Sequence, residues 1–306
     1  MKKTLVFLFF IAFTYQLNAQ NLTEFYDQKT YRYGLKDKNN TVIIPPTYDV
    51  IYWKENVDVF VVQSKYKYGL LDNNGKELLP IKYEFIGDFT DGLARIKSLD
   101  YKTGFIDKTG KIIIPLKFND AYDFSEGLSC IGTDFTDGWN KERRYGYIDK
   151  QGNEVIAPKF ALANSFSDGF AEVYDKTNNL WGYIDKTAKL MIPYSFEKVG
   201  GFSEGLAPVK KNNKWGFINK SGAVVIPYSY DSAGGFSEGL APVNAGASKN
   251  YVGNSVGGKW GFIDNKGKTT IGFNYDYAFG FYKGKARVSV GDRNFYINKN
   301  AVEVKQ

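Results

Sequence analysis

A repeat of about 35 residues runs through this chain and constrains the fold more than any other feature. The block at residues 214–219 reads KWGFIN, and close copies surround Trp181-Gly182 and Trp260-Gly261. One unit of this size cannot bury its own apolar face, so consecutive units must stack and cover one another. The aromatic-glycine pair, or its degenerate form, recurs at eight anchor positions. They are residues 34, 69, 104, 146, 182, 216, 261 and 295.

Each unit reads as three short strands. The first has a Leu-Ala-x-Val pattern, as at 206–209, and the second has Trp-Gly-aromatic-Ile. The third is Val-Val-Ile-Pro, and we expect Pro227 to end it because proline lacks the N–H that a strand ladder needs. An Asp-Lys-x-Gly segment, as at 107–110, joins the second and third strands and is typical of a bulged hairpin. Residues 20–306 show no helical periodicity.

We therefore predict an all-β fold, with about eight three-stranded antiparallel β-meanders in an open or superhelical array like a solenoid. A closed β-propeller is the competing arrangement. Propeller blades usually have four strands, and closure usually pairs the two chain ends in one blade. Three strands per unit and whole units at both ends favour the open array.

The sequence resembles the WG-repeat family, whose units carry a lysine-Trp-Gly-aromatic-Ile-Asp strand and a Val-Ile-Pro strand. The resemblance covers roughly residues 31–306 and is closest in the middle copies. It implies a β-repeat architecture and an interaction role. It implies no reaction, because the family has no agreed catalytic motif that could be carried over to this chain.

The aromatic and glycine of the repeat have a structural interpretation. Aromatic faces stack on sugars and cations, but these residues recur in register, which is what a repeating core contact produces. We therefore expect the repeat tryptophans to be core residues, together with the glycines that follow them. The clearest examples are Trp181, Gly182, Trp215, Gly216, Trp260 and Gly261.

The first residues predict export. Met1-Lys2-Lys3 precedes an apolar run from Leu5 to Phe13, and Ala19 supplies the small residue of a cleavage site. We expect a signal peptide at 1–19 and a single repeat domain at 20–306. The apolar run is shorter than the roughly 20 residues that span a bilayer, so the protein should not be integral to the membrane. Its destination would be the bacterial periplasm or the exterior.

Composition excludes several classes of site. Histidine is absent and Cys130 is the only cysteine, which excludes Ser-His-Asp and Cys-His nucleophiles, His-ligated metals and an intrachain disulfide. We expect neither a metal nor a cofactor. The formal net charge of +7 falls by two when Lys2 and Lys3 leave, and Asp is interleaved with Lys in most loops. This pattern predicts a solvated surface and no nucleic-acid partner.

A series of equivalent acids raises the possibility of a carboxylate-dependent glycan hydrolase. Such catalysis needs two carboxylates whose pKa values differ, whereas equivalent residues in equivalent turns share one environment. We therefore interpret these acids as turn residues of the repeat, and we expect no enzyme activity. The acids are Asp91, Glu126, Asp168, Glu204 and Glu238.

Two insertions interrupt the repeat and indicate the binding site. They occupy 132–140 and 244–258, both between the first and second strands. Trp139 has no counterpart in the repeat and lies close to Arg143 and Arg144, residue types that dominate interface energetics. A neutral surface loop whose tryptophan folds back on the sheet is an equally good interpretation. The leading hypothesis is an exported, non-enzymatic scaffold that binds protein or polysaccharide through its repeat surface and inserted loops.

Overall fold

The computed structural model describes residues 22–137, 140–249 and 255–305. The described residues form β-strands, turns and connections without a helix, so none of them belongs to a helix that could cross a membrane. The expected signal peptide at 1–19 lies outside this part of the chain.

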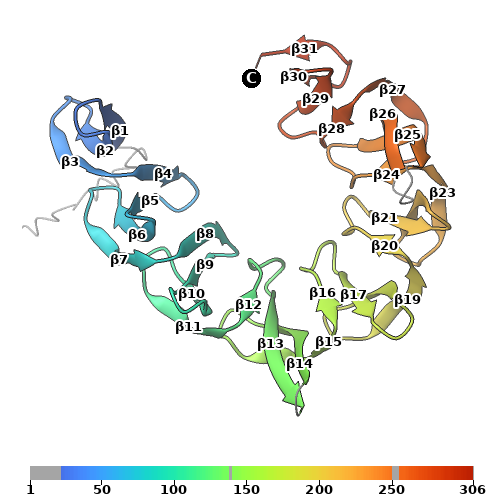
Figure 1. Cartoon of the computed structure of the whole chain (residues 1–306), viewed down its shortest axis with the longest axis horizontal. Helices are drawn as coiled ribbons and strands as arrows, with labels where there is room; N and C mark the ends of the chain where they lie inside the picture. The colour runs from blue at the N-terminus through green and yellow to red at the C-terminus, as the bar shows by residue number, and fades with distance from the viewer. Residues whose placement is uncertain (1–21, 138–139, 250–254, 306) are drawn as a thin grey trace, which may run out of the picture. The chain divides into compact units, whose positions relative to one another are not determined.

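The described strands form eight antiparallel sheets, one for each copy of the repeat (Figure 1). Consecutive strands are neighbours in every sheet, and none of these sheets closes into a barrel. The N-terminal sheets consist of β1 (Leu22–Asp27), β2 (Arg32–Asp37) and β3 (Val42–Tyr48); β4 (Val50–Lys54), β5 (Val59–Ser64), β6 (Lys67–Asp72) and β7 (Glu77–Tyr83); and β8 (Phe85–Thr90), β9 (Leu93–Lys97), β10 (Thr103–Ile106) and β11 (Ile112–Phe118).

The middle sheets consist of β12 (Asp120–Ala121), β13 (Ser129–Asp137), β14 (Asn140–Ile148) and β15 (Glu154–Phe160); β16 (Leu162–Ala163), β17 (Ala171–Asp175), β18 (Leu180–Ile184) and β19 (Leu190–Phe196); and β20 (Lys198–Val199), β21 (Leu206–Lys211), β22 (Lys214–Asn219) and β23 (Val224–Tyr230). The last two consist of β24 (Ser232–Ala233), β25 (Ala241–Lys249), β26 (Ser255–Ile263) and β27 (Thr269–Tyr275); and β28 (Tyr277–Ala278), β29 (Ala286–Val290), β30 (Arg293–Ile297) and β31 (Glu303–Val304).

The expected three strands per unit are found only in the first sheet, because the other seven contain a fourth strand. It precedes the Leu-Ala-x-Val strand and pairs with it, as Val199 of β20 does with Val209 of β21. A four-stranded meander is also the usual content of a propeller blade, so strand number no longer favours the open array. However, each described sheet takes its strands from one continuous stretch of chain, without the pairing of the two ends that usually closes a propeller.

The third strand does not end at its proline, contrary to the sequence-based expectation. β23 continues through Pro227 to Tyr230. Phe217 pairs with Ile226 and Trp215 pairs with Tyr230, so the intervening residues bulge away from the ladder. β23 is also the last strand of its sheet. A proline costs little at a bulge on an edge strand, because no ladder hydrogen bond is lost there.

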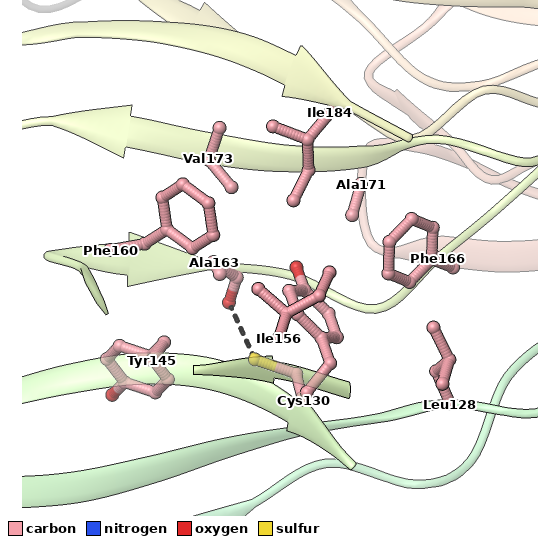
Figure 2. Packing of buried hydrophobic residues seen from close by; sticks show 11 residues of the cluster. Leu128, Cys130, Tyr145, Ile156, Phe160, Ala163, Phe166, Ala171, Val173 and Ile184 are labelled. Atoms are coloured by element: carbon pink, nitrogen blue, oxygen red, sulfur yellow. Dashed lines mark hydrogen bonds between the residues drawn. The ribbon is translucent and has the colours of Figure 1, made fainter. Parts of the chain in front are cut away.

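The core is divided into clusters that lie between consecutive sheets. Figure 2 shows one such cluster, in which residues of β13 to β15 pack against those of β16 to β18. Within it the Cys130 thiol lies 3.5 Å from the carbonyl oxygen of Ala163, and burial raises its pKa, so it is a passive core residue. Where such a cluster joins two sheets, stability depends on contacts between neighbouring repeats.

An aromatic pair joins consecutive sheets in five places. The aromatic residue after the repeat glycine is fully buried and contacts a phenylalanine of the following repeat, with ring centroids 4.8–5.0 Å apart. Such pairs add about 0.5–1.5 kcal/mol to the free energy of burial. The pairs are Phe105 with Phe124, Tyr147 with Phe166, Tyr183 with Phe202, Phe217 with Phe236, and Phe262 with Phe281.

The chain divides into two compact units. One extends to Ile86 and includes Lys108–Lys111, and the other contains Gly87–Asp107 and the chain from Ile112 onward. The first has its own cluster, in which Leu35, Phe60 and Val62 are buried. The candidate sites described below all belong to the second unit.

Candidate functional site

The first insertion is a hairpin extension rather than a loop. β13 and β14 are nine residues long and pair residue for residue, from Ser129 opposite Ile148 to Asp137 opposite Asn140. The equivalent strands in repeats without an insertion are four to six residues long. The hairpin therefore extends beyond the repeat. Trp139, a candidate binding residue, lies outside the described residues.

Arg143 belongs to an ion cluster on this hairpin. Its Nε donates to Oδ1 of Asp134 at 2.7 Å, and Nζ of Lys141 lies 3.1 Å from Oδ2 of the same carboxylate. The hydrogen bond from Arg143, and to a smaller extent the one from Lys141, lowers the pKa of Asp134 to about 2. Asp134 thus carries a negative charge at neutral pH and fixes the Arg143 guanidinium against the strand.

Arg144 has a different environment from Arg143, because neighbouring residues of a strand point to opposite faces. Its Nη2 lies 3.2 Å from Oε2 of Glu142, and its guanidinium lies 5.1 Å from the centroid of the Phe135 ring. Phe135 remains 39% exposed, so the cation covers only part of this apolar ring. The two candidate arginines therefore do not form one patch.

Arg144 lines a groove of about 480 Å³, which we call the charged groove. Its wall also includes Glu142, Lys159, Tyr174, Lys176 and Tyr194. Nζ of Lys176 lies 3.5 Å from Oε1 of Glu142, and the Lys176 and Glu142 side chains are 73% and 39% exposed. The charged groove thus presents both signs of charge beside two tyrosine rings, a combination suited to a polar partner.

The repeat tryptophans lie at the edge of the core rather than inside it. Trp181 and Trp215 are partly exposed, whereas Tyr183 and Phe217, two residues further along the strands, are fully buried. Trp181 and Trp215 line a second groove of about 470 Å³, which we call the aromatic groove. Trp260, equivalent to both in the repeat, packs beside the last core cluster instead, with its ring 5.5 Å from that of Tyr277.

The repeat glycines lie where the backbone leaves no room for a side chain. A Cβ added to Gly216 would lie 2.6 Å from the carbonyl oxygen of Ile226, which is closer than real Cβ atoms approach. At Gly182 and Gly261 the corresponding distance to a carbonyl oxygen is 2.7 Å. The bulge in the third strand brings this oxygen towards the second strand, so only a residue without a side chain fits.

Each member of the acidic series bonds to the next repeat. Its carboxylate accepts a hydrogen bond of 2.6–3.2 Å from the backbone N–H of a turn glycine. The pairs are Asp91 with Gly127, Glu126 with Gly169, Asp168 with Gly205, Glu204 with Gly239, and Glu238 with Gly284. These acids therefore join repeats, as the turn interpretation allows, and do not form a pair of carboxylates in different environments.

The second insertion is also a pair of long strands, β25 and β26. Asp231, at the start of this repeat, accepts hydrogen bonds from Nζ of Lys214 at 2.6 Å and from the N–H of Ala247 at 3.0 Å. Burial raises the pKa of Asp231, but its hydrogen bonds and the positive charge of Lys214 together outweigh burial and lower the pKa overall. The base of this hairpin is thus tied to the preceding repeat.

Glu172 is a buried titratable residue that the sequence reasoning did not single out. It is 3% exposed, and burial raises the pKa of its carboxyl from 4.5 to about 6. Equivalent positions in the next two repeats hold Pro208 and Pro242. Other repeats hold Arg95 and Arg287 at this position, so the repeat pattern gave no signal that a carboxylate would be buried here.

A comparison with known proteins identifies the repeat. The family model described as WG containing repeat matches residues 33–68, 68–102, 104–134, 145–176, 181–215, 215–246 and 260–293. No curated protein matches the chain in sequence.

Three solved structures of similar fold share 10–12% of their residues with this chain. A eukaryotic initiation factor has a TM-score of 0.48 at 10% identity, with 92% of this chain and 94% of that chain covered. BamB from Moraxella catarrhalis has a TM-score of 0.43 at 10% identity, covering 93% and 95%. The extracellular domain of the one component system BT4673 from B. thetaiotaomicron has a TM-score of 0.44 at 12% identity, covering 92% and 47%. The seven family matches extend over most of the sequence, and the chain belongs to the WG containing repeat family.

Proposed function

We propose that this chain is an exported, non-enzymatic scaffold that binds a protein or polysaccharide partner through its repeat surface and its first inserted hairpin. The observation that carries the proposal is the charged groove at the base of the β13–β14 hairpin. Exposed ion pairs such as Arg144 with Glu142 contribute little to folding, about 0–1 kcal/mol. A hairpin longer than its equivalents and rich in such pairs is better explained by binding than by stability.

Arginine and tyrosine beside the groove support this assignment. Both residue types are enriched at interface positions that dominate binding energy, and the Arg144 side chain is 46% exposed. Because the groove also carries Glu142 and Asp175, the partner should present both signs of charge or hydroxyl groups. These properties fit a protein surface or a polysaccharide.

The environments of the acidic side chains support binding of a partner rather than hydrolysis of a glycan. The five equivalent carboxylates accept hydrogen bonds from the next repeat. The carboxyl of Glu172, whose pKa is raised, is buried. A glycan hydrolase also needs a general acid whose pKa is raised, whereas hydrogen bonds with Arg144 and Thr177 lower the pKa of the two carboxyls in the charged groove, Glu142 and Asp175. Export is supported by the sequence of residues 1–19, and fractionation of the producing cell, followed by mass determination of the mature N-terminus, would test it.

The binding proposal is tested with residues 20–306 immobilised and exposed to an envelope extract and to a polysaccharide array. We expect a captured partner that is lost when Trp139→Ala, Arg143→Ala and Arg144→Ala are combined. Arg293→Ala is the matched control, because Arg293 also pairs with a glutamate and lies 5.1 Å from an aromatic centroid, that of Phe295, but in the last sheet. Absence of any partner, equal loss in the control, or cleavage of a glycan would contradict the proposal.

A further inference from the structure

The aromatic groove lies at a junction where the usual ion pair of the repeat is missing. In two later repeats a lysine precedes the tryptophan and bonds to an aspartate of the next repeat, as Lys214 does with Asp231 at 2.6 Å and Lys259 with Asp276 at 2.5 Å. Here Leu180 takes the place of the lysine. Its acidic counterpart, Glu197, instead accepts the backbone N–H of Asn213 at 3.2 Å within its own sheet. The groove is therefore not bridged by that ion pair.

Aromatic rings from two sheets line this groove. Trp181 of β18 and Tyr174 of β17 are stacked at a tilt of 47°, with centroids 5.1 Å apart, and Trp215 of β22 comes from the next sheet. All three side chains are partly exposed. Partly exposed ring faces are uncovered apolar area, and covering them is favourable. A sugar ring can do this, because it has an apolar C–H face and a polar rim.

The polar groups of the groove suit hydroxyl groups rather than charges. Asn164 and Asn179 contribute amides, which both donate and accept hydrogen bonds as hydroxyls do. Glu197 and Lys198 contribute one charge of each sign, so their formal charges cancel. A groove with this balance should prefer a neutral ligand to a polyanion.

A peptide that adds a strand to a sheet edge is a less suitable ligand for the aromatic groove than a sugar. The first strands of the two flanking sheets, β16 and β20, are only two residues long. They offer too few backbone groups for an added strand, which takes its affinity from main-chain hydrogen bonds. The volume of about 470 Å³ falls within the range of about 300–1,000 Å³ found for small-ligand sites.

We infer that the aromatic groove binds a neutral oligosaccharide segment, with its sugar rings stacked on Trp181 and Trp215 and its hydroxyls on the amides and on Glu197. This inference rests on the proposed binding function and names the ligand class of a second site on the same surface. It requires no cofactor and no bond to be broken.

The test is calorimetric titration of residues 20–306 with cellohexaose, xylohexaose, mannohexaose and laminarihexaose, with tryptophan fluorescence as the second readout. An oligogalacturonate is the anionic probe. We expect at least one neutral hexasaccharide to bind with a millimolar or lower dissociation constant and to shift the tryptophan emission. Trp181→Ala and Trp215→Ala should each weaken binding by about tenfold or more.

Trp260→Ala is the matched control, because Trp260 holds the same repeat position but does not line this groove, and it should change the affinity by less than about twofold. Asn164→Ala and Glu197→Ala alter exposed groove residues, so they test the site even if a tryptophan variant fails to fold. Failure of all four neutral hexasaccharides to bind, preference for the oligogalacturonate, or equal loss in Trp260→Ala would overturn the inference. An envelope partner lost in the hairpin variants, together with no hexasaccharide binding, would overturn this inference alone and leave the scaffold proposal standing.

Discussion

Glycines of the repeat are needed for two different physical reasons. Gly216 has an ordinary backbone conformation but no room for a side chain, because the carbonyl oxygen of Ile226 occupies the space. Gly205 has open space around it but a φ of +81°, which disfavours any residue with a Cβ. Space limits the first position and backbone conformation limits the second.

We therefore expect Gly216→Ala to be the more damaging change. The added methyl must displace the bulged third strand, at a cost of about 3 kcal/mol. Gly205→Ala should cost about 1 kcal/mol, the penalty of a left-handed residue with a Cβ. Urea unfolding of both variants measures the difference. Equal losses would mean that the bulge relaxes freely around the methyl group.

Glu172 makes stability depend on pH. Its carboxyl has a pKa of about 6 in the fold against 4.5 as a free side chain, because burial disfavours the charged form. The folded protein therefore holds this proton more tightly, so the contribution to stability is full below pH 4.5 and is lost as pH rises through about 6. The shift is equivalent to about 2 kcal/mol.

Glu172→Gln should accordingly stabilise the protein by about 2 kcal/mol at about pH 7 and have little effect at about pH 4. The amide keeps the size of the side chain and has no charge to bury. Denaturant unfolding of parent and variant at both pH values measures the effect. The same free-energy difference at both pH values would show that titration of Glu172 is not its cause.

At the scale of the element, the Phe-Ser-Glu-Gly turn fastens one repeat to the next. Glu204 has a left-handed φ of 54° and its carboxylate reaches the N–H of Gly239, while the Ser203 hydroxyl donates to the carbonyl of Phe236 at 2.7 Å. A left-handed glutamate is strained, and the bond to the next repeat offsets that strain. This explains why an acid occupies a position for which asparagine or glycine is the usual choice.

Two substitutions separate the bond from the strain. Glu204→Ala removes the carboxylate and keeps the strained backbone, so it should destabilise by about 1–2 kcal/mol. Glu204→Gly removes both and should cost clearly less than the alanine. Thermal and urea unfolding compare them, with Asp292→Ala, on the surface of the last sheet, as a neutral control. A smaller loss for alanine than for glycine would contradict the assignment.

Sequence alone predicts the repeat, its eight copies and the hairpin turns. It misses the fourth strand, which in five of the seven described four-stranded sheets has only two residues and so shows no alternation of side chains. It also misplaces the tryptophans. Trp215 and Phe217 point to the same face of β22, and only the position of the following sheet decides which ring is covered. Both grooves depend on that packing, so periodicity alone could not predict them.

At the scale of the whole molecule, stability should be a sum of contacts between neighbours. The core clusters each join two consecutive sheets, and no described sheet combines strands from both chain ends. In such an array, a substitution in one core cluster destabilises the two sheets that the cluster joins and leaves the stability of more distant sheets unchanged. In a single cooperative block, the same defect would weaken every sheet together.

Amide hydrogen exchange of two core variants distinguishes an array of neighbouring contacts from a single cooperative block. Phe262 is fully buried in the cluster between β24–β27 and β28–β31, and its truncation in Phe262→Ala should cost about 3–5 kcal/mol locally. We expect faster amide exchange in β24 to β31 and unchanged exchange in β8 to β15. Phe105→Ala, in the cluster that joins those earlier sheets, should give the reverse pattern. If both variants accelerate exchange uniformly from β8 to β31, the sheets unfold as one unit, as a closed propeller would, and the nearest-neighbour description is wrong.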